Sequence, residues 1–255
     1  MSSSLSRPFL SIVIPAYNEE RRLVATLATI AAYLDAGRID AEILVVDDGS
    51  KDRTAELAAS SLAGRRGRVL RNGENRGKGY SVRHGAIEAR GRFVLVCDAD
   101  LSTPIEEHAR LARTMRDKDG DVVIGSRALP DSNVLVRQSW LRQTMGKSFN
   151  RIIRVLTRLP QRDTQCGFKL IDRDRVKPLL EKMVVDGFAY DVELLFLCSK
   201  FGLSVAEVPV SWRNAAGSKV SLLSDPMRMI ADVLRVRWRF RRGLYNPKAE
   251  PVDVS

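Results

Sequence analysis

The segment Phe93-Val94-Leu95-Val96-Cys97-Asp98-Ala99-Asp100 joins a short apolar run directly to two aspartates. A short apolar run rich in β-branched and aromatic residues is typical of a buried β-strand. Asp98 and Asp100 stand on either side of Ala99, so their side chains can face one hard divalent cation together. An Asp-x-Asp motif is common by chance, and its place at the end of a strand gives this one its weight.

Two segments upstream repeat the arrangement of an apolar run followed by polar residues. They are Pro15-Ala16-Tyr17-Asn18-Glu19 and Asp47-Asp48-Gly49-Ser50. Stretches with helical spacing of apolar residues lie between the runs, and this alternation predicts βαβ units around a mostly parallel sheet. We expect strands at Leu10–Pro15, Glu42–Asp47, Gly67–Arg71, Phe93–Asp98 and Asp121–Gly125. We expect helices at Glu19–Ala36, Asp52–Ala63, Lys78–Ala89 and Pro104–Lys118.

The carboxyl ends of parallel strands form the ligand crevice of an open α/β sheet. Acidic side chains from three strand ends should therefore converge there, namely Glu19, Asp47, Asp48, Asp98 and Asp100. Carboxylates crowded in this way raise one another's pKa values unless a cation or a ligand compensates their charge. Because Mg²⁺ takes one or two protein carboxylates together with phosphate oxygens, Asp98 and Asp100 fit a metal–diphosphate site. For Asp47 and Asp48 a simple turn is the alternative, because Asp-Gly is favoured in turns.

The loop Asn75-Arg76-Gly77-Lys78-Gly79 precedes a predicted helix, and its amides and cations can face phosphates. It is not a Walker A sequence, because Gly79 follows the Gly-Lys pair, and no G-x-G-x-x-G follows the first strand. The sequence also has no G-x-S-x-G elbow, and His84 and His108 have no partner pattern for hydrolase or metal chemistry. P-loop hydrolysis and Rossmann dinucleotide binding therefore lose their main sequence support.

The composition is that of a soluble globular chain, because 44% of the 255 residues are hydrophobic and 29% are charged. The three cysteines are widely spaced, which argues against a disulfide framework or structural zinc and favours a reducing cytoplasm. No apolar stretch is long enough to span a bilayer, and the start does not resemble a signal peptide. We expect disorder only in residues 1–8 and in the tail, residues 246–255.

The net charge of +11 is concentrated in two windows, residues 132–162 and residues 226–248. Each window holds seven arginines or lysines, with Asp232 as the only acid. Apolar residues recur at helical spacing in both, which predicts basic amphipathic helices within 134–160 and over 226–245. The stripes are Leu141, Met145, Phe149, Ile152, Leu156 and Leu159 in the first, and Met227, Ile230, Leu234 and Trp238 in the second. Such helices suit an interface with anionic lipid, and core-packed helices with a solvated basic face are the alternative.

Eight segments along residues 10–240 together resemble the dolichyl-phosphate β-glucosyltransferases and their bacterial polyprenyl-phosphate relatives within glycosyltransferase family 2. They are Ile14-Pro15-Ala16-Tyr17-Asn18-Glu19-Glu20, Val45-Val46-Asp47-Asp48-Gly49-Ser50, Asn75-Arg76-Gly77-Lys78-Gly79, Asp98-Ala99-Asp100, Gly125-Ser126-Arg127, Asp163-Thr164-Gln165-Cys166-Gly167-Phe168-Lys169, Phe188-Ala189-Tyr190-Asp191-Val192-Glu193 and Gly217-Ser218-Lys219. The resemblance implies a GT-A fold over residues 9–225, an α/β architecture with a Rossmann-like, mostly parallel sheet and flanking helices. The amphipathic C-terminal helices would be added to this domain.

The resemblance also implies roles for the matching residues. The nucleotide-sugar donor would lie against Pro15, Ala16, Tyr17, Glu19, Asp47, Asp48, Gly77 and Lys78. Asp98, Ala99 and Asp100 would face its diphosphate, with Asp98 and Asp100 as ligands of Mg²⁺ or Mn²⁺. Gln165, Gly167 and Phe168 would line the sugar pocket, and Asp191 with Glu193 would be the acidic pair near the acceptor. The acceptor phosphate would meet Arg127, Arg142, Arg213, Ser218 and Lys219, and the catalytic residues would be Asp191, Arg127 and Lys219. A solvated or structural charge is the alternative for Arg142 and Arg213.

Two departures from the family pattern bear on substrate and location. Mannosyl members tend to place a third metal ligand just after the Asp-x-Asp, where this chain has Ser102, and this weakens GDP-mannose as the donor. Eukaryotic members carry an N-terminal membrane anchor that this sequence lacks, so attachment would depend on the basic helices, on a membrane-protein partner, or on both. We therefore expect a peripheral protein at the cytoplasmic, inner face of the plasma membrane, with no nucleic-acid partner.

The expected reaction is inverting transfer of glucose from UDP-glucose to a polyprenyl phosphate. A lipid phosphate is ionised near pH 7, so catalysis would consist mainly of positioning and charge stabilisation. With a sugar hydroxyl as the acceptor, Asp191 would be the candidate base. UDP-N-acetylhexosamine and GDP-mannose are alternative donors. A non-catalytic basic module that binds membrane or nucleic acid is the alternative from another class, and it does not account for the acidic strand ends.

Overall fold

A seven-stranded sheet forms the centre of the computed structural model, which describes residues 7–135, 140–213 and 224–246. Its strands are β1 (Leu10–Ala16), β2 (Ala41–Asp47), β3 (Gly67–Arg71), β4 (Phe93–Val96), β5 (Val122–Ser126), β7 (Lys169–Asp172) and β8 (Val205–Pro209). Their order is β3-β2-β1-β4-β7-β5-β8, and of these seven only β7 runs antiparallel to its neighbours. A separate pair joins β6 (Asn133–Val134) to β9 (Ser211–Trp212). The predicted mostly parallel α/β fold is confirmed.

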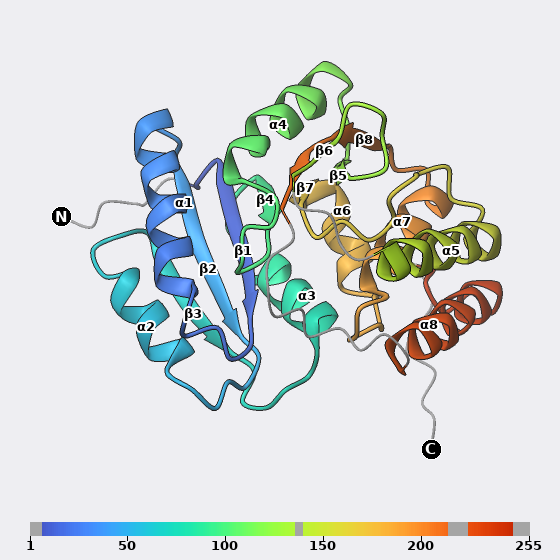
Figure 1. Ribbon diagram of the computed structural model, residues 1–255, viewed down its shortest axis with the longest axis horizontal. Coiled ribbons are helices and arrows are strands. Elements are labelled where there is room, and N and C mark those ends of the chain that lie inside the picture. Colours follow the sequence, from blue (N-terminus) through green and yellow to red (C-terminus); the bar gives the residue numbers. More distant parts are fainter. Residues whose placement is uncertain (1–6, 136–139, 214–223, 247–255) are drawn as a thin grey trace.

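Helices cover the sheet (Figure 1). They are α1 (Leu23–Gly37), α2 (Thr54–Ser61), α3 (Lys78–Glu88), η1 (Ile105–Glu107), α4 (His108–Asp117), α5 (Trp140–Thr157), α6 (Arg173–Leu180), α7 (Tyr190–Lys200) and α8 (Ser224–Arg241). The first three predicted helices form as α1, α2 and α3, and the fourth is divided into η1 and α4. The sequence patterns did not predict α7, because residues 190–198 are all buried and so show no helical alternation of polar and apolar residues.

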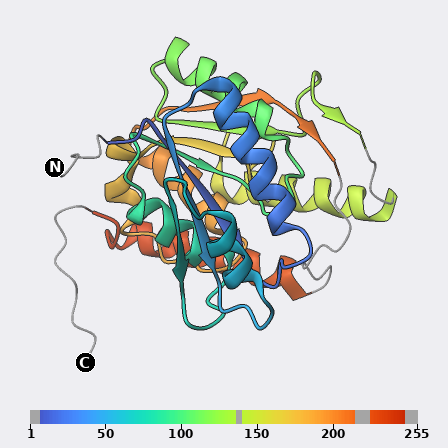
Figure 2. The same cartoon turned by 90° about the vertical axis from the view of Figure 1, so that its left-hand side faces the viewer.

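The core consists of two apolar layers, one on each face of the sheet. Alternate residues of a strand point to opposite faces, so Val13 packs in one layer while Ile12 and Ile14 pack in the other. The layer around Val13 includes α3, α6, α7 and α8, and the layer around Ile12 includes α1 and α4. Figure 2 accordingly shows α4 and α8 at opposite sides of the molecule. Because the central strands are buried on both faces, they read as continuous apolar runs in the sequence.

The strand order reverses beside β1, because β2 and β3 lie on one side of it and β4 lies on the other. In the registers of these parallel pairs, Ala16 lies beside Asp47 and Val13 lies beside Val96. The polar segments that follow β1, β2 and β4 therefore start at the same edge of the sheet. Open α/β sheets bind ligands at such a reversal point, outside the carboxyl ends of the strands.

β7 brings a later part of the chain to this same edge. It lies between β4 and β5 and pairs Lys169 with Val96 at one end and Asp172 with Phe93 at the other. Because β7 is antiparallel to β4, the segment before Lys169 enters the sheet where Asp98 lies. The segment after Asp172 leaves at the opposite edge.

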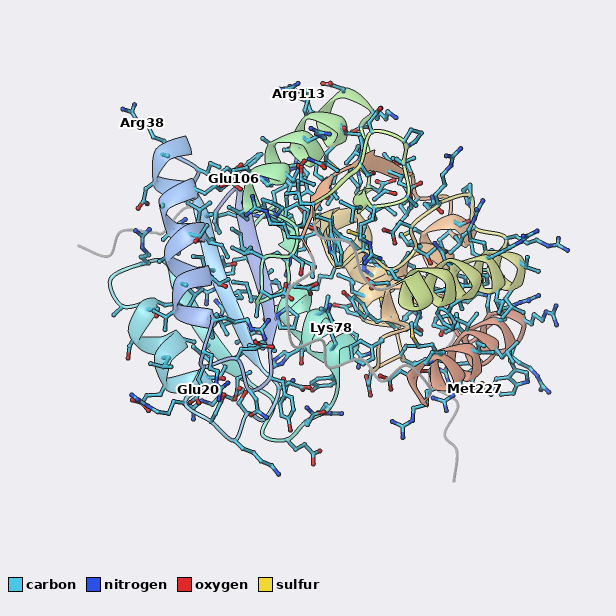
Figure 3. The ribbon with its side chains drawn as sticks, in the orientation of Figure 1. Glu20, Arg38, Lys78, Glu106, Arg113 and Met227 are labelled. Carbon is cyan, nitrogen blue, oxygen red and sulfur yellow. The ribbon has the colours of Figure 1, made fainter. Side chains whose placement is uncertain are left out.

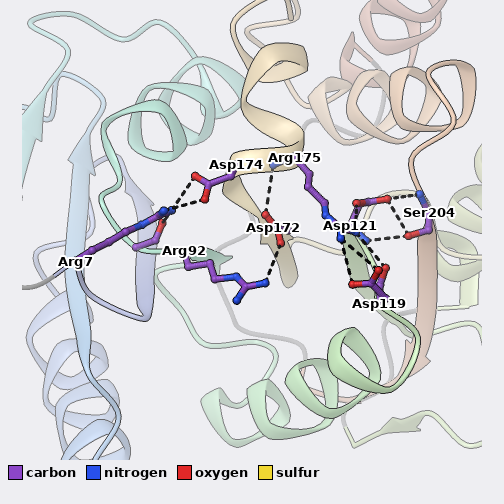
Figure 4. Close-up of polar contacts among 9 residues, drawn as sticks. Arg7, Arg92, Asp119, Asp121, Asp172, Asp174, Arg175 and Ser204 are labelled. Carbon is purple, nitrogen blue, oxygen red and sulfur yellow. Dashed lines mark hydrogen bonds and ion pairs between the residues drawn. The ribbon is translucent and has the colours of Figure 1, made fainter.

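Ion pairs join several segments at that opposite edge (Figure 4). Arg7 donates to both carboxylate oxygens of Asp174 at 2.8 Å. Arg175 donates to Asp121 at 3.0 Å, and the same carboxylate accepts the amide and the hydroxyl of Ser204 at 2.7 and 3.0 Å. Together these contacts fasten the N-terminal segment and the start of β8 to α6 and β5.

The helix α8 is apolar on two sides. The buried side holds Met229, Val233 and Val236. The other side holds Met227, Leu234 and Trp238, whose exposed fractions are 70%, 49% and 52%. The stripe predicted from the sequence is therefore the outer one, and a second stripe anchors the helix in the core. Lipid-facing and core-packed helices were alternatives in the sequence, and α8 has an apolar face suited to each.

The helix α5 packs against α8, and its buried face differs from the predicted stripe. Ile153 is fully buried, whereas Ile152 is 45% exposed and Val155 is 72% exposed. Because residues 152 and 153 are both isoleucine, spacing alone could not decide which of them faces the core. The predicted stripe is therefore divided, because Ile152 faces outward while Phe149 and Leu156 pack against the core, and the side chains of Leu141 and Met145 lie outside the described residues.

The chain is ordered closer to its start than predicted. Pro8 is buried, and its carbonyl accepts the amide of Arg92 at 3.2 Å, so the expected disorder of residues 1–8 is wrong at Arg7 and Pro8. Near the other end, Tyr245 is 1% exposed and packs beyond the end of α8. None of the helices that the structure describes is both long enough and apolar enough to cross a bilayer.

Asp121→Asn should lower the free energy of unfolding at pH 7 by about 1.5–3 kcal/mol, because a buried carboxylate loses charge-assisted hydrogen bonds. Burial would raise the pKa of Asp121, but Ser204 and Arg175 outweigh it, and the pKa lies below its ordinary 3.8. The contribution is therefore complete above the ordinary pKa and is lost as the pH falls through the lower, folded-state value. Urea unfolding at pH 7 and near pH 3 measures both effects.

The matched control is Asp117→Asn, because the Asp117 side chain is 58% exposed. We expect it to change the free energy of unfolding by less than about 0.5 kcal/mol. A gap between wild type and Asp121→Asn that stayed constant down to the lowest pH would contradict the assignment.

Candidate functional site

The Asp98 carboxylate lies between a lysine and a glycine. Lys78, the first residue of α3, places its Nζ atom 2.6 Å from Asp98 Oδ1, and Figure 3 labels it near the middle of the molecule. A Cβ atom at Gly167 would lie 2.5 Å from Asp98 Oδ2, so only glycine permits this approach. Burial would raise the pKa of Asp98, but the charges of Lys78, Lys169 and Arg127 outweigh it, and the pKa lies below its ordinary value.

Asp100 is held by its own turn and lies near an arginine at the start of α1. Its Oδ1 atom accepts the Ser102 amide at 2.9 Å, and its Oδ2 atom lies 3.9 Å from Arg22 Nη1. Arg22 Nε pairs with Glu19 at 2.8 Å. Ala99, between the two aspartates, is buried. Arg22 thus brings the acidic ends of β1 and β4 together, a role that the sequence patterns did not indicate.

Asp48 organises the basic loop that precedes α3. Its carboxylate accepts the amides of Arg76 and Gly77 at 3.0 and 2.9 Å and the side-chain amide of Asn72 at 2.8 Å. The carboxylate is therefore engaged within the protein by a loop 24–29 residues further along the chain, and not by the local turn that was the alternative. The loop it fixes places Lys78 beside Asp98, so Asp48 shapes the site through its backbone contacts.

The ends of β1 and β2 lie side by side at the same edge. Asp47 is 5% exposed, and its Oδ1 atom accepts the Ser50 amide at 3.2 Å. Ala16 is buried, while Pro15 and Tyr17 are half-buried. These residues stand where the prediction placed a nucleoside pocket, and their contact with a nucleotide stays a prediction.

The backbone around Lys78 is fixed against the segment that precedes α7. Gly77 has φ of +103°, a conformation that favours glycine, and a Cβ atom there would lie 2.4 Å from the Asp186 carbonyl oxygen. The amides of Gly79 and Tyr80 donate to that carbonyl at 2.7 and 3.1 Å. Burial would lower the pKa of Lys78, but Asp98 and other carboxylates outweigh it, so the pKa is raised and the ammonium stays charged.

A second ion pair, between Lys169 and Asp191, is buried near the pair of Lys78 and Asp98. Lys169 is fully buried, and its Nζ atom contacts Asp191 Oδ1 at 2.5 Å and the Cys166 carbonyl. Burial raises the pKa of Asp191, and Lys169 and Lys78 offset only part of this effect. Asp191, predicted as a catalytic residue, is thus brought near Asp98 but is only 4% exposed. Lys169 was not predicted, although a lysine inside an apolar strand is itself a signal of a buried partner.

Two predicted site residues, Glu193 of the acidic pair and Phe168 of the sugar pocket, are directed into the protein. Glu193 is 1% exposed, and its carboxylate accepts the amides of Val184 and Val185 and the hydroxyl of Tyr245. Phe168 is 2% exposed and packs in the apolar layer around Ile12. The structure therefore does not bring either side chain to the crevice, because the first braces a loop and the second fills the core.

Gln165 contacts α8, and Arg127 is held between Asp163 and Trp212. Gln165 Nε2 lies 3.7 Å from Met229 Sδ. Arg127 makes a bidentate ion pair with Asp163 at 2.7 and 2.9 Å, and its guanidinium carbon lies 5.5 Å from the centre of the Trp212 ring. Burial would lower the pKa of Arg127, but Asp163 outweighs it and raises the pKa. The guanidinium is held by two hydrogen bonds, and the Arg127 side chain is still 34% exposed, which suits a phosphate contact.

The remaining predicted phosphate contacts are only partly described. The amide of Arg213 donates to the Ser102 carbonyl at 2.8 Å, so the backbone of this exposed arginine is bound to the turn that follows the Asp-x-Asp motif. Ser218 and Lys219 lie outside the described residues, and so does the side chain of Arg142.

The aspartates fit a metal that is shared with a ligand. Within the described ranges no group of three or more histidine, cysteine, aspartate or glutamate side chains is placed to hold a metal. Asp98 and Asp100 supply hard oxygen ligands and are 34% and 28% exposed. Mg²⁺ or Mn²⁺ held by this pair would complete its shell with phosphate oxygens and water.

Gly167→Ala should weaken binding of UDP with Mn²⁺ by about tenfold or more, because the new methyl group displaces the Asp98 carboxylate and overpacking costs about 1–3 kcal/mol. Isothermal titration calorimetry measures the effect. The control is Gly120→Ala, where a Cβ atom would meet nothing closer than 3.7 Å. Equal affinities in the two variants would show that the position of Asp98 does not matter for binding.

Comparison with solved structures supports the architecture. The chain superposes on mannosyl-3-phosphoglycerate synthase from Rubrobacter xylanophilus with a TM-score of 0.69 and 22% identity, over 96% of this chain and 78% of that one. It superposes on glucosyl-3-phosphoglycerate synthase from Mycobacterium tuberculosis, crystallised with Mn²⁺, UDP-glucose and glycerol 3-phosphate, with a TM-score of 0.67 and 21% identity. That match covers 90% of this chain and 80% of the other. At these identities the likeness is one of fold.

Sequence comparison identifies nearer relatives. The chain is 34% identical to a dolichyl-phosphate β-glucosyltransferase of Dictyostelium discoideum, over 94% of this chain and 77% of that protein. It is 32% identical to the human dolichyl-phosphate β-glucosyltransferase, over 92% and 76% of the two chains. The family model for glycosyl transferase family 2 matches residues 11–180. The predicted family and the prediction of a hexosyltransferase are confirmed, and the alternative of a non-catalytic module is not supported. The chain belongs to glycosyl transferase family 2.

Proposed function

We propose that this enzyme transfers glucose from UDP-glucose to a polyprenyl phosphate, with inversion at the anomeric carbon. The observation that carries the proposal is the meeting of Asp98, Asp100 and Lys78 at the reversal point of the sheet, with Arg127 close by. This edge offers both carboxylates for a metal and cations for a diphosphate. The names of the relatives supply the sugar and the lipid phosphate.

In the proposed reaction an oxygen of the lipid phosphate attacks the anomeric carbon from the side opposite the leaving group. A carbon–oxygen bond forms there, and the bond to the β-phosphate oxygen breaks with its electron pair, so UDP departs. The attacking oxygen is already ionised, and no proton needs to be removed. Arg127 and Lys78 then stabilise negative charge that grows on the leaving diphosphate.

A divalent metal on Asp98 and Asp100 would supply Lewis-acid stabilisation of the leaving group. Ser102 contributes its amide to Asp100 and its carbonyl to Arg213. Its position is the one where mannosyl members tend to place a third metal ligand, so the chain fits UDP-glucose better than GDP-mannose. Asp191 is buried beside Lys169, and we assign it the role of ion-pair partner of this lysine. If the acceptor were a sugar hydroxyl, Asp191 would instead be the candidate base.

We place the acceptor side of the enzyme at a membrane, on the cytoplasmic face. The outer stripe of α8 offers Met227, Leu234 and Trp238, and α5 offers Ile152 and Val155. Exposed arginines flank these side chains, including Arg151, Arg154, Arg235 and Arg242. Apolar residues with arginines around them favour the boundary of anionic lipid. A membrane-protein partner would be an additional attachment.

Titration with UDP-glucose, UDP-N-acetylglucosamine and GDP-mannose, each with Mn²⁺ and with EDTA, tests the donor. We expect UDP-glucose to bind most tightly and only with Mn²⁺. Asp100→Ala should weaken that binding by at least about tenfold while leaving thermal unfolding near that of wild type, because it removes a charged ligand whose side chain is only partly buried. The control is Asp117→Ala, and failure of all three donors to bind would refute the proposal.

Replacing outward apolar residues of α8 tests the membrane face. Leu234→Gln with Trp238→Ser should lower partition onto vesicles of phosphatidylglycerol and phosphatidylcholine by about tenfold or more, because each side chain contributes roughly 1.5–3 kcal/mol when fully buried. Donor binding should stay unchanged. The matched control replaces Val24 with Gln and Phe9 with Ser, which are 45% and 50% exposed elsewhere. Equal loss in both double variants would argue against a specific membrane face.

A further inference from the structure

The Asp98 carboxylate, one half of the expected metal site, is already paired with a cation of the protein itself. The Lys78 Nζ atom lies 2.6 Å from Asp98 Oδ1, a short charge-assisted hydrogen bond. A divalent cation on the same carboxylate would meet the positive charge of this ammonium at close range. Two like charges that share one partner disfavour each other. Lys78 and the metal therefore compete for Asp98.

The two members of the pair differ in freedom of movement. Asp98 is confined, because its carboxylate packs closely against Gly167: a Cβ atom at that residue would lie 2.5 Å from Asp98 Oδ2. The backbone of Lys78 is also fixed, since its neighbours Gly77 and Gly79 pack against Asp186 and the segment around it. The ammonium, in contrast, lies at the end of four methylene groups and its side chain is 26% exposed. The ammonium can turn away while the carboxylate stays in place.

Asp100 differs from Asp98 in this respect. Arg22 Nη1 lies 3.9 Å from its Oδ2 atom, and its firm contact is with the Ser102 amide. Asp100 thus offers an oxygen to a metal at less cost than Asp98 does. Before a nucleotide binds, a metal would meet one accessible carboxylate and one that Lys78 already neutralises.

We propose that Lys78 is an exchangeable counter-cation that occupies Asp98 until a diphosphate arrives, and that it then turns onto the phosphates and leaves Asp98 to the metal. This inference deepens the proposed function and rests on it. Metal and nucleotide then bind together, because each removes an obstacle to the other. By thermodynamic linkage, the factor by which UDP strengthens Mn²⁺ binding equals the factor by which Mn²⁺ strengthens UDP binding.

The test measures Mn²⁺ affinity from the electron paramagnetic resonance signal of free Mn²⁺, with and without UDP. In wild type we expect UDP to strengthen Mn²⁺ binding by about tenfold or more, within the usual range of coupling between sites. Lys78→Met should bind Mn²⁺ about five- to tenfold more tightly than wild type without UDP, because Asp98 is released, and should show weaker coupling. Lys78→Arg keeps the charge and should retain weak binding of Mn²⁺ alone.

Lys118→Met is the matched control, since Lys118 is exposed beyond the end of α4, and it should behave as wild type. Thermal unfolding establishes that each variant is folded, and Lys78→Gln replaces Lys78→Met if the latter is not. Unchanged or weaker binding of Mn²⁺ alone after loss of the Lys78 charge would overturn the exchange.

The two proposals fail in different ways. If no nucleotide sugar binds to wild type but loss of Lys78 still strengthens binding of Mn²⁺ alone, the donor assignment fails and the competition for Asp98 stands. If UDP-glucose binds with Mn²⁺ but the Lys78 variants match wild type in Mn²⁺ affinity, the exchange fails and the function stands.

Discussion

The compensation of charge around Asp98 is the constraint on which the site depends. The Asp98 carboxylate is only partly exposed to water, so cations nearby stabilise its charge, and Lys78 supplies one at 2.6 Å. Lys169 and Arg127 contribute two further positive charges that lower the pKa of Asp98. Lys169 is itself held in place by Asp191, and Arg127 is held by Asp163. These cations come from separate parts of the chain. Sheet topology therefore has to bring them together before the site can exist.

Local sequence patterns predicted the part of the site that depends on strand ends. An apolar strand that ends in Asp98, the convergence of acidic strand ends at one edge and the loop before α3 all follow from short segments and general rules of α/β sheets. Each element could therefore be placed before its partners were known. The mostly parallel sheet and the first helices were predicted for the same reason.

The contacts that complete the site could not be predicted in this way, because their partners are far apart along the chain. Nothing near Asp191 in the sequence indicates Lys169, and nothing near Asp100 indicates that Arg22 links it to Glu19. Phe168 and Glu193 lie in segments shared with the family, yet only burial shows that they serve the core. Likewise, neighbouring isoleucines in α5 left the choice of buried face to tertiary packing.

The antiparallel strand β7 has a consequence for how the protein forms during synthesis. Strands β1, β2 and β3 pair among themselves and with β4, so these four strands can assemble before the rest of the sheet is synthesised, although the second edge of β4 still lacks its partner β7. Within the described residues β5 pairs with β7 and β8, which are both made later, so both of its edges lack partners in the nascent chain. Pairing between distant segments is slow and exposes apolar surface meanwhile. This enzyme thus most needs protection from aggregation while the second half of its chain is being synthesised.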